Sequence, residues 1–241
     1  SYIMTDPFMT SVTRISDLST RGFETRSLPR EQWDTGDYVV ARVSNNHGRL
    51  SSLELPDGRM TEVMEDDLLV GAFGTRAATL EAVGDWRAIG ASGELNALTA
   101  AGLLGMVTSL SPFLSAPMRL QYQGHAMRNG DKLTMRGSLA PMEMIDFDIP
   151  VILIFGTSMS AGKTTSGRVI VHLLSKMGLK VVGAKLTGAA RYRDMLSFKD
   201  AGASAVYDFV DAGLPSSVVD ADLYREALPY LLSLIALQQP D

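Results

Sequence analysis

Ten residues near the middle of the chain have the types and order of a phosphate-binding loop. The segment 156–165 reads Gly-Thr-Ser-Met-Ser-Ala-Gly-Lys-Thr-Thr. Polyphosphate carries several charges on closely spaced oxygens, and backbone N–H groups at the start of a helix donate to them within the favourable field of the helix dipole. Glycine lets the backbone come close, lysine neutralises the β- and γ-phosphates, and a following hydroxyl binds magnesium. We therefore predict that this loop binds ATP or another nucleoside triphosphate together with Mg²⁺.

Each part of the loop has an expected role. Gly162 supplies the turn, Lys163 the charge and Thr164 the hydroxyl for Mg²⁺. The pattern departs from G-x-x-x-x-G-K-[ST], because Thr157 stands at the first position and the glycine comes one residue earlier. The alternative is an ordinary strand-to-helix turn, but the sequence on both sides favours the phosphate site. The expected nucleotide-binding residues are Gly156, Thr157, Ser158, Ser160, Ala161, Gly162, Lys163, Thr164 and Thr165.

The patterns that flank the loop predict a parallel α/β sheet. Val151–Phe155 is an unbroken apolar run, which is typical of a strand buried on both faces. Residues 163–177 place apolar side chains at helical spacing and end before a glycine. A strand over 180–186 completes a βαβ unit, whose crossover implies parallel strands. A third strand over 203–210 and a helix over 222–237 are expected to follow.

The predicted fold has two parts. Residues 1–148 are expected to form a small β-rich barrel or sandwich, because short strands such as Tyr38–Val43 alternate with turn signals. A helix from about Gly93 to Leu110 would cap or plug it. Residues 149–241 are expected to form a P-loop α/β parallel sheet. A doubly wound sheet needs more than three strands, so this part is expected to be incomplete, with further strands downstream.

The loop and the second predicted strand resemble a known family. Gly156-Thr157, four residues and then Gly162-Lys163-Thr164 resemble the loop of dethiobiotin synthetase and of the cobyrinic acid a,c-diamide synthase group. The similarity extends to residues 183–188 and covers none of residues 1–148. In those enzymes the second strand also ends in a lysine that faces the substrate. The resemblance implies ATP-dependent activation of a carboxylate or carbamate through a phosphoryl intermediate. The family's Walker B acidic residue has no clear counterpart in this sequence.

Two lysines are the candidate catalytic residues. Lys163 would hold the γ-phosphate with Mg²⁺, since phosphoryl transfer depends mostly on positioning and charge neutralisation. Lys185 would lie at the carboxyl end of its strand, where open α/β sheets bind ligands. The alternative for Lys185 is a surface lysine, and the sequence does not decide between them. The segment 187–197, which carries two arginines and Asp194, would be a substrate or switch loop, although a solvated connection is favoured.

Two oxygen donors are the candidate metal ligands. Thr164 supplies a hydroxyl, and Asp208 follows the third predicted strand in Tyr-Asp-Phe-Val-Asp-Ala-Gly. A carboxylate at the end of a strand beside a phosphate-binding loop holds magnesium or its waters. For Asp208 the alternative of a helix-cap or turn carboxylate is kept and slightly preferred.

Composition narrows the classes of function. The 241 residues include no cysteine, which excludes disulfides, Cys-ligated zinc, iron–sulfur clusters and a cysteine nucleophile. The net charge of −5 gives no global basic field for nucleic acid. The most membrane-like stretch, 95–114, has polar interruptions that favour a buried helix over a membrane span. We expect a cytoplasmic protein without nucleic-acid or membrane partners, with assembly into a homo-oligomer left open.

Two functions fit these observations. The first is an ATP-dependent enzyme for phosphoryl transfer or ligase-type activation of a small-molecule carboxylate, in which the β-rich part selects a substrate or partner. The second is a nucleotide-gated regulatory or assembly NTPase, in which hydrolysis drives a conformational change or docking of the β-rich part. Lys185 facing the γ-phosphate would favour the enzyme, and a nucleotide-dependent dimer face would favour the switch.

Overall fold

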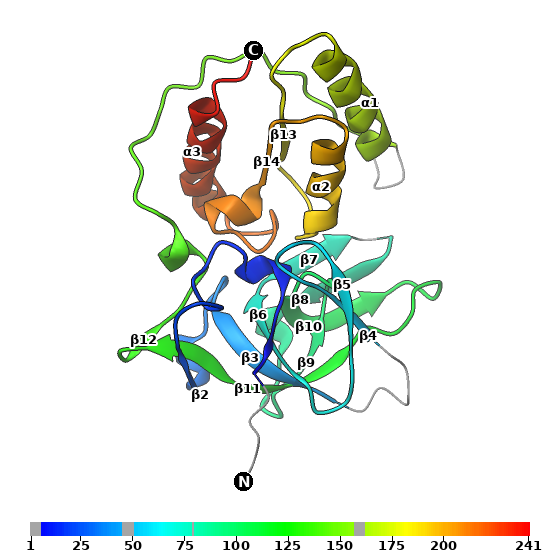
Figure 1. The fold of residues 1–241 in the computed structure, drawn as a ribbon. Coiled ribbons are helices and arrows are strands. Elements are labelled where there is room, and N and C mark those ends of the chain that lie inside the picture. The colour runs from blue at the N-terminus through cyan, green and yellow to red at the C-terminus, as the bar shows by residue number, and fades with distance from the viewer. Residues whose placement is uncertain (1–5, 45–50, 79, 157–161) are drawn as a thin grey trace.

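A computed structural model places the chain in two lobes (Figure 1). The β-rich lobe spans residues 6–138 and lies below the helical lobe, residues 162–241, in the view of Figure 1. Residues 139–156, which connect the lobes, form no helix or strand; they run first beside the last helix of the chain and then cross to the first helix of the helical lobe. The structure describes residues 6–44, 51–78, 80–156 and 162–241.

Short strands and single-turn helices make up the β-rich lobe. Its strands are β1 (Phe8–Met9), β2 (Glu24–Arg26), β3 (Tyr38–Val43), β4 (Ser51–Glu54), β5 (Met60–Val63), β6 (Leu68–Phe73), β7 (Thr75–Ala78), β8 (Ala82–Asp85), β9 (Glu94–Ala97), β10 (Leu103–Leu110), β11 (Arg119–Arg128) and β12 (Asp131–Lys132). Its 3₁₀ helices are η1 (Ser11–Thr13), η2 (Arg30–Gln32), η3 (Trp86–Ala88) and η4 (Arg136–Ser138). The helical lobe contains α1 (Lys163–Lys176), β13 (Val182–Lys185), α2 (Tyr192–Asp200), β14 (Ala205–Asp208), η5 (Phe209–Ala212) and α3 (Ala221–Leu237).

The main sheet of the β-rich lobe closes on itself. Strands β6, β3, β11, β9 and β10 pair in a ring, antiparallel except where β10 returns parallel to β6. The hairpin of β7 and β8 extends from β10, and β2 and β12 pair with β11. Closure removes the free backbone edges that an open sheet would expose. This ring makes the β-rich lobe a rigid platform.

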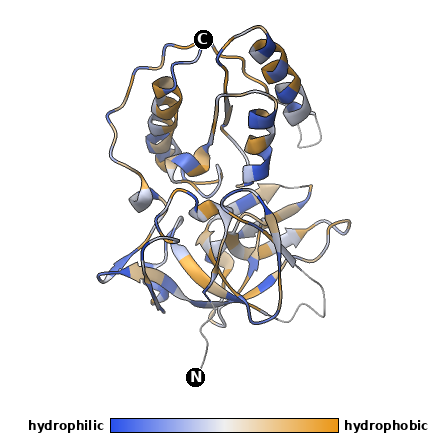
Figure 2. Cartoon of the chain, viewed as in Figure 1, coloured by the Kyte–Doolittle hydropathy of each residue, from blue (hydrophilic) through white to orange (hydrophobic). Residues whose placement is uncertain are grey.

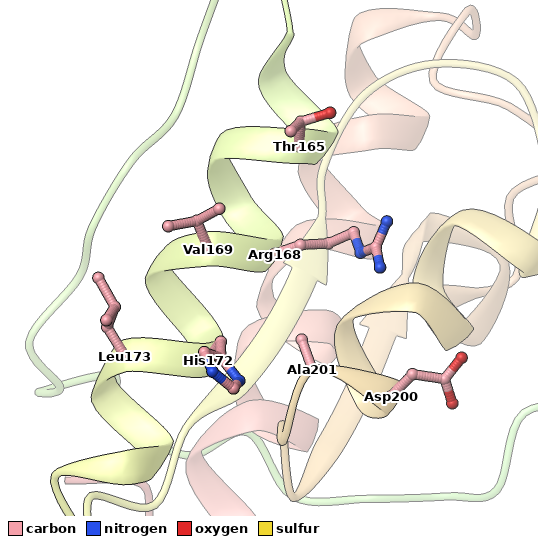
Figure 3. A pocket seen from close by; sticks show the side chains of 7 residues that line it. All are labelled: Thr165, Arg168, Val169, His172, Leu173, Asp200 and Ala201. Carbon is pink, nitrogen blue, oxygen red and sulfur yellow. The ribbon is translucent and has the colours of Figure 1, made fainter.

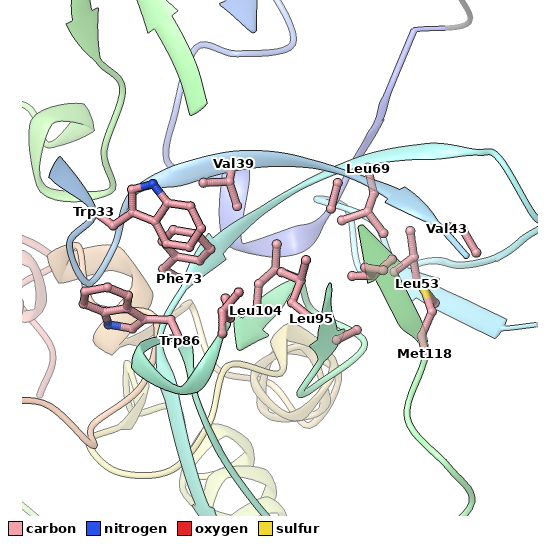
Figure 4. Packing of buried hydrophobic residues seen from close by; sticks show 14 of the residues in the cluster. Trp33, Val39, Val43, Leu53, Leu69, Phe73, Trp86, Leu95, Leu104 and Met118 are labelled. Atoms are coloured by element: carbon pink, nitrogen blue, oxygen red, sulfur yellow. The ribbon is translucent and has the colours of Figure 1, made fainter. Parts of the chain in front are cut away.

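The inside of the ring holds an aromatic and aliphatic core (Figure 4). Phe73 lies between Trp33 and Trp86, with ring centroids 5.0 and 5.7 Å away. Leu95 and Leu104 are fully buried beside these rings. Burial of aromatic side chains removes a large apolar area from water, so this cluster is a main source of stability for the lobe.

Strands β3 and β6 are buried on both faces, because each face meets a different cluster. Val39 and Ala41 of β3 point into the ring, whereas Tyr38 and Val40 belong to a second cluster on the other side. That second cluster also contains residues of the helical lobe, including Phe209, Leu214 and Leu231. Side chains alternate along a strand, so an apolar run with both faces covered indicates a layer on each side. The two lobes therefore share one apolar core, and we call this core, together with the polar contacts between the lobes around it, the junction.

The helical lobe is built around two parallel strands. β13 and β14 pair in register, with Lys185 beside Asp208 at their carboxyl ends. α2 packs on both strands, α3 packs on β14, and α1 packs against α2. Figure 1 shows α3 on one side of the strands and α1 and α2 on the other. In the described part of the chain, none of the helices combines the length and apolar character that a membrane span requires.

The predicted P-loop α/β parallel sheet is wrong. The structure is mostly β, and its main sheet is a mixed one of ten strands in the β-rich lobe. Among the described residues of the helical lobe, the parallel pairing is limited to β13 with β14. The strand patterns over 180–186 and 203–210 are present in shortened form, but they do not continue into a larger parallel sheet.

The apolar run Val151–Phe155 is not the buried strand that its sequence predicts. These residues have no strand assignment, and their side chains are 37 to 85% exposed. The run appears as an orange trace ahead of α1 in Figure 2. A strand needs hydrogen-bond partners for its backbone, and among the described residues β13 and β14 pair with each other and not with this run. Ile154, the least exposed of the five, lies beside Gly167 of α1 instead.

The helix predicted from about Gly93 to Leu110 is also wrong. β9 and β10 occupy this stretch and pair antiparallel, with Leu104 beside Ala97. The chain turns between them at Gly102, whose φ of +93° suits glycine and whose Cβ, if present, would lie 2.0 Å from Thr10 Oγ1. Periodicity cannot distinguish two short buried strands from one buried helix, and the hydrogen bonds of the ring decide the outcome.

Candidate functional site

The start of α1 has the geometry of an anion-binding helix end. Gly162 adopts a left-handed conformation with φ +74°, and α1 begins at the next residue, Lys163. In the described residues no side chain caps this end, and no acidic residue lies in the first turn. The first N–H groups of a helix have no partner within it, so they can donate to an external anion. Thr164 and Thr165 are exposed in the same turn.

Part of the predicted loop lies outside the described residues. Thr157, Ser158, Ser160 and Ala161 lie outside the described residues, and Gly156 is exposed at the end of the apolar run. α1 itself is held by close packing on α2, because Gly167 lies against Phe198. A Cβ at Gly167 would lie 2.6 Å from Cε1 of that ring. The orientation of the helix start therefore depends on the contact between α1 and α2.

A groove of about 460 Å³ lies between α1 and the end of α2 (Figure 3). It begins at Thr165 and continues along α1, where Val169 and Leu173 supply an apolar wall. Figure 3 shows Arg168 pointing from α1 toward α2. The groove is lined by Thr165, Arg168, Val169, His172, Leu173, Asp200 and Ala201.

Lys185 and Asp208 meet at the carboxyl ends of β13 and β14. They are neighbours in the parallel register. The Nζ atom of Lys185 donates to the carbonyl of Ala189 at 3.2 Å and lies 3.3 Å from Oδ2 of Asp194. The side chain of Lys185 is half-buried. The sequence prediction that Lys185 ends a strand is confirmed, and the structure adds two carboxylates near its ammonium group.

Asp208 is almost completely buried, and its two carboxylate oxygens differ in their hydrogen-bond partners. Oδ1 accepts from Nη2 of Arg14 at 2.7 Å and from the backbone N–H of Val210 at 2.9 Å. Oδ2 has no hydrogen-bond partner among the described residues. Burial raises the pKa of Asp208 to about 6, although the Arg14 guanidinium acts in the opposite direction. With Asp211 it forms a capping box at the start of η5, so its cap role is confirmed.

Arg14 reaches these carboxylates from the β-rich lobe. Its Nη1 atom donates to Oδ1 of Asp211 at 2.6 Å, and its guanidinium lies 4.3 Å from the ring centroid of Tyr192. Burial opposes the charge of Arg14, but Asp208 and Asp211 outweigh that effect and raise the pKa of the guanidinium. Sequence reasoning missed Arg14 because no motif links it to residues almost two hundred positions later.

Glu54 is a second contact from the β-rich lobe and was also missed. Its buried carboxylate accepts from Oγ of Ser11 at 2.6 Å and from the backbone N–H groups of Tyr192 and Arg193 at 2.7 and 3.0 Å. These N–H groups belong to the first turn of α2, so a carboxylate of one lobe caps a helix of the other. The second half of the predicted segment 187–197 is therefore a docked helix start.

The predicted site residues fall into two groups. Lys163, Thr164 and Thr165 lie at the start of α1, whereas Lys185 and Asp208 lie at the ends of the strands. No hydrogen bond joins Thr164 to Asp208 in the part of the chain that the structure describes. There, too, no three His, Cys, Asp or Glu side chains gather as a metal site.

Magnesium does not require such a gathering of protein ligands. It is commonly held by one or two carboxylates plus substrate phosphates and water. The partnerless Oδ2 of Asp208 and the hydroxyl of Thr164 are hard oxygen donors of this kind. The donor chemistry therefore fits the metal, with most of its coordination left to phosphate and water.

Comparisons with known proteins yield no match. The chain fits no protein-family model, and no curated protein or solved structure shows significant similarity to it. The resemblance to the dethiobiotin synthetase group stays a prediction that depends on residues 156–188. The function therefore has to be argued from the chemistry of the site.

Proposed function

We propose that the protein binds ATP or another nucleoside triphosphate, with Mg²⁺, at the start of α1. The observation that carries this proposal is the left-handed Gly162 followed by Lys163 and two threonines in an uncapped first turn. The N–H groups of the first turn, a positive helix end and a lysine together offer the donors and charge that a polyphosphate needs. A merely structural turn does not need a lysine followed by two exposed hydroxyls.

The roles of the side chains follow from their positions. Lys163 pairs with the β- and γ-phosphates, and the N–H groups of the first turn hold the phosphate oxygens. Thr164 and the free oxygen of Asp208 are the protein donors for magnesium, which neutralises charge on the transferred phosphoryl group when bound. The groove that begins at Thr165 offers space for the remainder of a ligand anchored at this turn.

The reaction that we propose is phosphoryl transfer or ligase-type activation of a small-molecule carboxylate. Lys185 supports this because its half-buried ammonium group lies at the carboxyl end of β13, next to Asp208. An ammonium in a partly desolvated position attracts a carboxylate anion more strongly than one in open water. Its present partner, Asp194, is nearly half exposed, so a substrate carboxylate can replace it.

A second function, a nucleotide-gated regulator, is supported by the contacts between the lobes. Arg14 and Glu54 extend from the β-rich lobe to the elements that carry Asp208 and Asp194. A conformational change at the ends of β13 and β14 would therefore be transmitted to the β-rich lobe through these contacts.

We also propose a cytoplasmic protein that uses no nucleic-acid or membrane partner. The lack of cysteine and the net charge of −5 support this. A homo-oligomer remains part of the proposal. The exposed apolar side chains of Val151–Phe155 support it, because contiguous apolar surface often marks an interface.

Calorimetry with ATP and Mg²⁺ tests the binding site. Lys163→Ala should abolish ATP binding, because the phosphate charge would lose its main counter-charge. Lys176→Ala, at the other end of the same helix, is the matched control and should bind as the unaltered protein does. Equal affinity of the Lys163 variant and the unaltered protein would rule out the site.

A further inference from the structure

Arg14 donates hydrogen bonds to both carboxylates at the start of η5, those of Asp208 and Asp211. Its guanidinium makes contacts of 2.7 Å to Asp208 and of 2.6 and 3.1 Å to the two oxygens of Asp211. The Arg14 side chain is only 11% exposed, so these contacts are shielded from water. Charged hydrogen bonds with this fork geometry are strong and fix the orientation of the partners.

One oxygen of Asp208 receives no hydrogen bond from Arg14. Oδ2 is buried and has no partner among the described residues, while Oδ1 is fully engaged. A buried acceptor without a partner is costly, and such a group in a folded protein calls for an explanation. One explanation is a ligand at this oxygen, because Asp208 adjoins Lys185 at the carboxyl ends of β13 and β14, where we place the substrate carboxylate.

We propose that Arg14 is a positioning residue through which the β-rich lobe controls Asp208, so that a divalent cation at this carboxylate competes with the guanidinium. The inference rests on the proposed metal role of Asp208. Arg14 keeps the carboxylate fixed and occupied by a protein cation when no metal is bound. A metal at Oδ2 brings a second positive charge next to the guanidinium and weakens the contact of Arg14.

Competition at Asp208 would be transmitted to the junction. Arg14 follows η1 directly, and Ser11 within η1 donates to Glu54, which caps α2. The guanidinium also lies over Tyr192, the first residue of α2. Displacement of Arg14 therefore weakens a contact between the lobes at the place where α2 and η5 begin. Cation binding and tight docking of the lobes oppose each other.

Binding of Mn²⁺ alone, followed by the loss of the free-ion signal in electron paramagnetic resonance, tests this competition. The variant Arg14→Ala should bind Mn²⁺ about tenfold or more tightly than the unaltered protein, because a neighbouring opposite charge changes the ligand affinity of a carboxylate by about that much. The gain should disappear in Arg14→Ala with Asp208→Asn. Equal Mn²⁺ affinity with and without Arg14 would overturn the inference.

Two control variants separate the positioning of Asp208 by Arg14 from a general weakening of the contacts between the lobes. Glu54→Gln weakens the junction at its other contact, and Arg136→Ala removes an exposed ion pair to Glu226 that also joins the lobes. Neither should tighten Mn²⁺ binding. A gain in Glu54→Gln equal to that in Arg14→Ala would show that any weakening of the junction suffices, and would contradict the inference.

The unaltered protein provides a measurement that does not depend on the folding of a variant. The Nε–H resonance of Arg14 should shift when Mg²⁺ is added to saturation, and an unchanged resonance would overturn the inference. Neither experiment contains nucleotide. A failure of ATP to bind in calorimetry, with these metal effects intact, would count against the proposed function alone.

Discussion

The two lobes bury their apolar residues in different ways. In the β-rich lobe, a closed ring of strands surrounds fully buried side chains such as Phe73 and Leu104. In the helical lobe, Val169 and Leu173 of α1 are more than half exposed. Of the large side chains that this lobe buries completely, Phe209 and Leu214 belong to the cluster shared with the β-rich lobe, and Met195 of α2 does not. The first lobe carries its own core, and the second depends on the junction.

This difference indicates where conformational change is least costly. Regions with few buried contacts open at lower free energy than the core of a domain. The candidate site residues Lys163, Lys185 and Asp208 all lie in the helical lobe. A rigid platform thus positions a more adaptable lobe, and the contacts of Arg14 and Glu54 determine how firmly it is held.

The largest expected effect comes from the core of the β-rich lobe. Phe73→Ala should lower the free energy of unfolding by about 3–5 kcal/mol, because it leaves a cavity among Trp33, Trp86 and Tyr122. Leu173→Ala on the exposed side of α1, in the helical lobe, should change it by less than about 0.5 kcal/mol. Urea unfolding measures both. Similar losses would contradict the contrast between the lobes.

The junction should give the next largest effect. Glu54→Ala removes the acceptor for Ser11 and for the first N–H groups of α2, at a cost of about 2–3 kcal/mol. Arg136→Ala, which removes the exposed ion pair with Glu226, should lower the free energy of unfolding by less than about 1 kcal/mol. Hydrogen exchange of α2 amides should be faster in the Glu54 variant alone. Unchanged protection there would mean that α2 does not depend on the β-rich lobe.

Asp208 should make stability depend on pH in metal-free buffer. Its pKa is raised from 3.8 to about 6 in the folded protein, so the folded state holds the proton more tightly than the unfolded state. This contribution is fully present below about pH 4 and is lost as the pH rises through about 6, with a size on the order of 1–3 kcal/mol.

The variant Asp208→Asn isolates that contribution. The free energy of unfolding of the unaltered protein should fall relative to the variant between pH 4 and 7, as measured by urea titrations across that range. Parallel curves for the two proteins would show that burial does not hold a proton on Asp208.

Lys185→Ala should have the smallest effect on stability. Its pair with Asp194 is partly exposed, so the free energy of unfolding should change by less than about 1 kcal/mol. We expect ATP affinity in calorimetry to stay unchanged while carboxylate-dependent phosphate release is lost. Loss of ATP affinity would instead place Lys185 in the nucleotide site.

Local elements of the fold were predictable where one pattern acted alone. The strand Tyr38–Val43 has the predicted bounds, and the helix predicted over 163–177 is present as α1. The left-handed Gly162 also follows from its type and place before the helix. Each of these depends on a turn signal or a hydrophobic period within its own segment.

Features that depend on distant contacts were not predictable. Val151–Phe155 has the composition of a buried strand, but composition does not supply the backbone partners that a strand needs. Arg14 and Glu54 stand in ordinary sequence contexts, and their importance comes from partners 138 or more positions away. The Asp208–Asp211 spacing signals a cap, yet nothing local shows that an arginine completes it.

The central claim is that phosphates bind to the backbone at the start of α1. Amide resonances of Lys163, Thr164 and Thr165, recorded by nuclear magnetic resonance during titration with ATP and Mg²⁺, test it most directly. We predict large shifts at these amides and small ones at the other end of α1, around Lys176. Saturating ATP that leaves the three amides unchanged would contradict the claim.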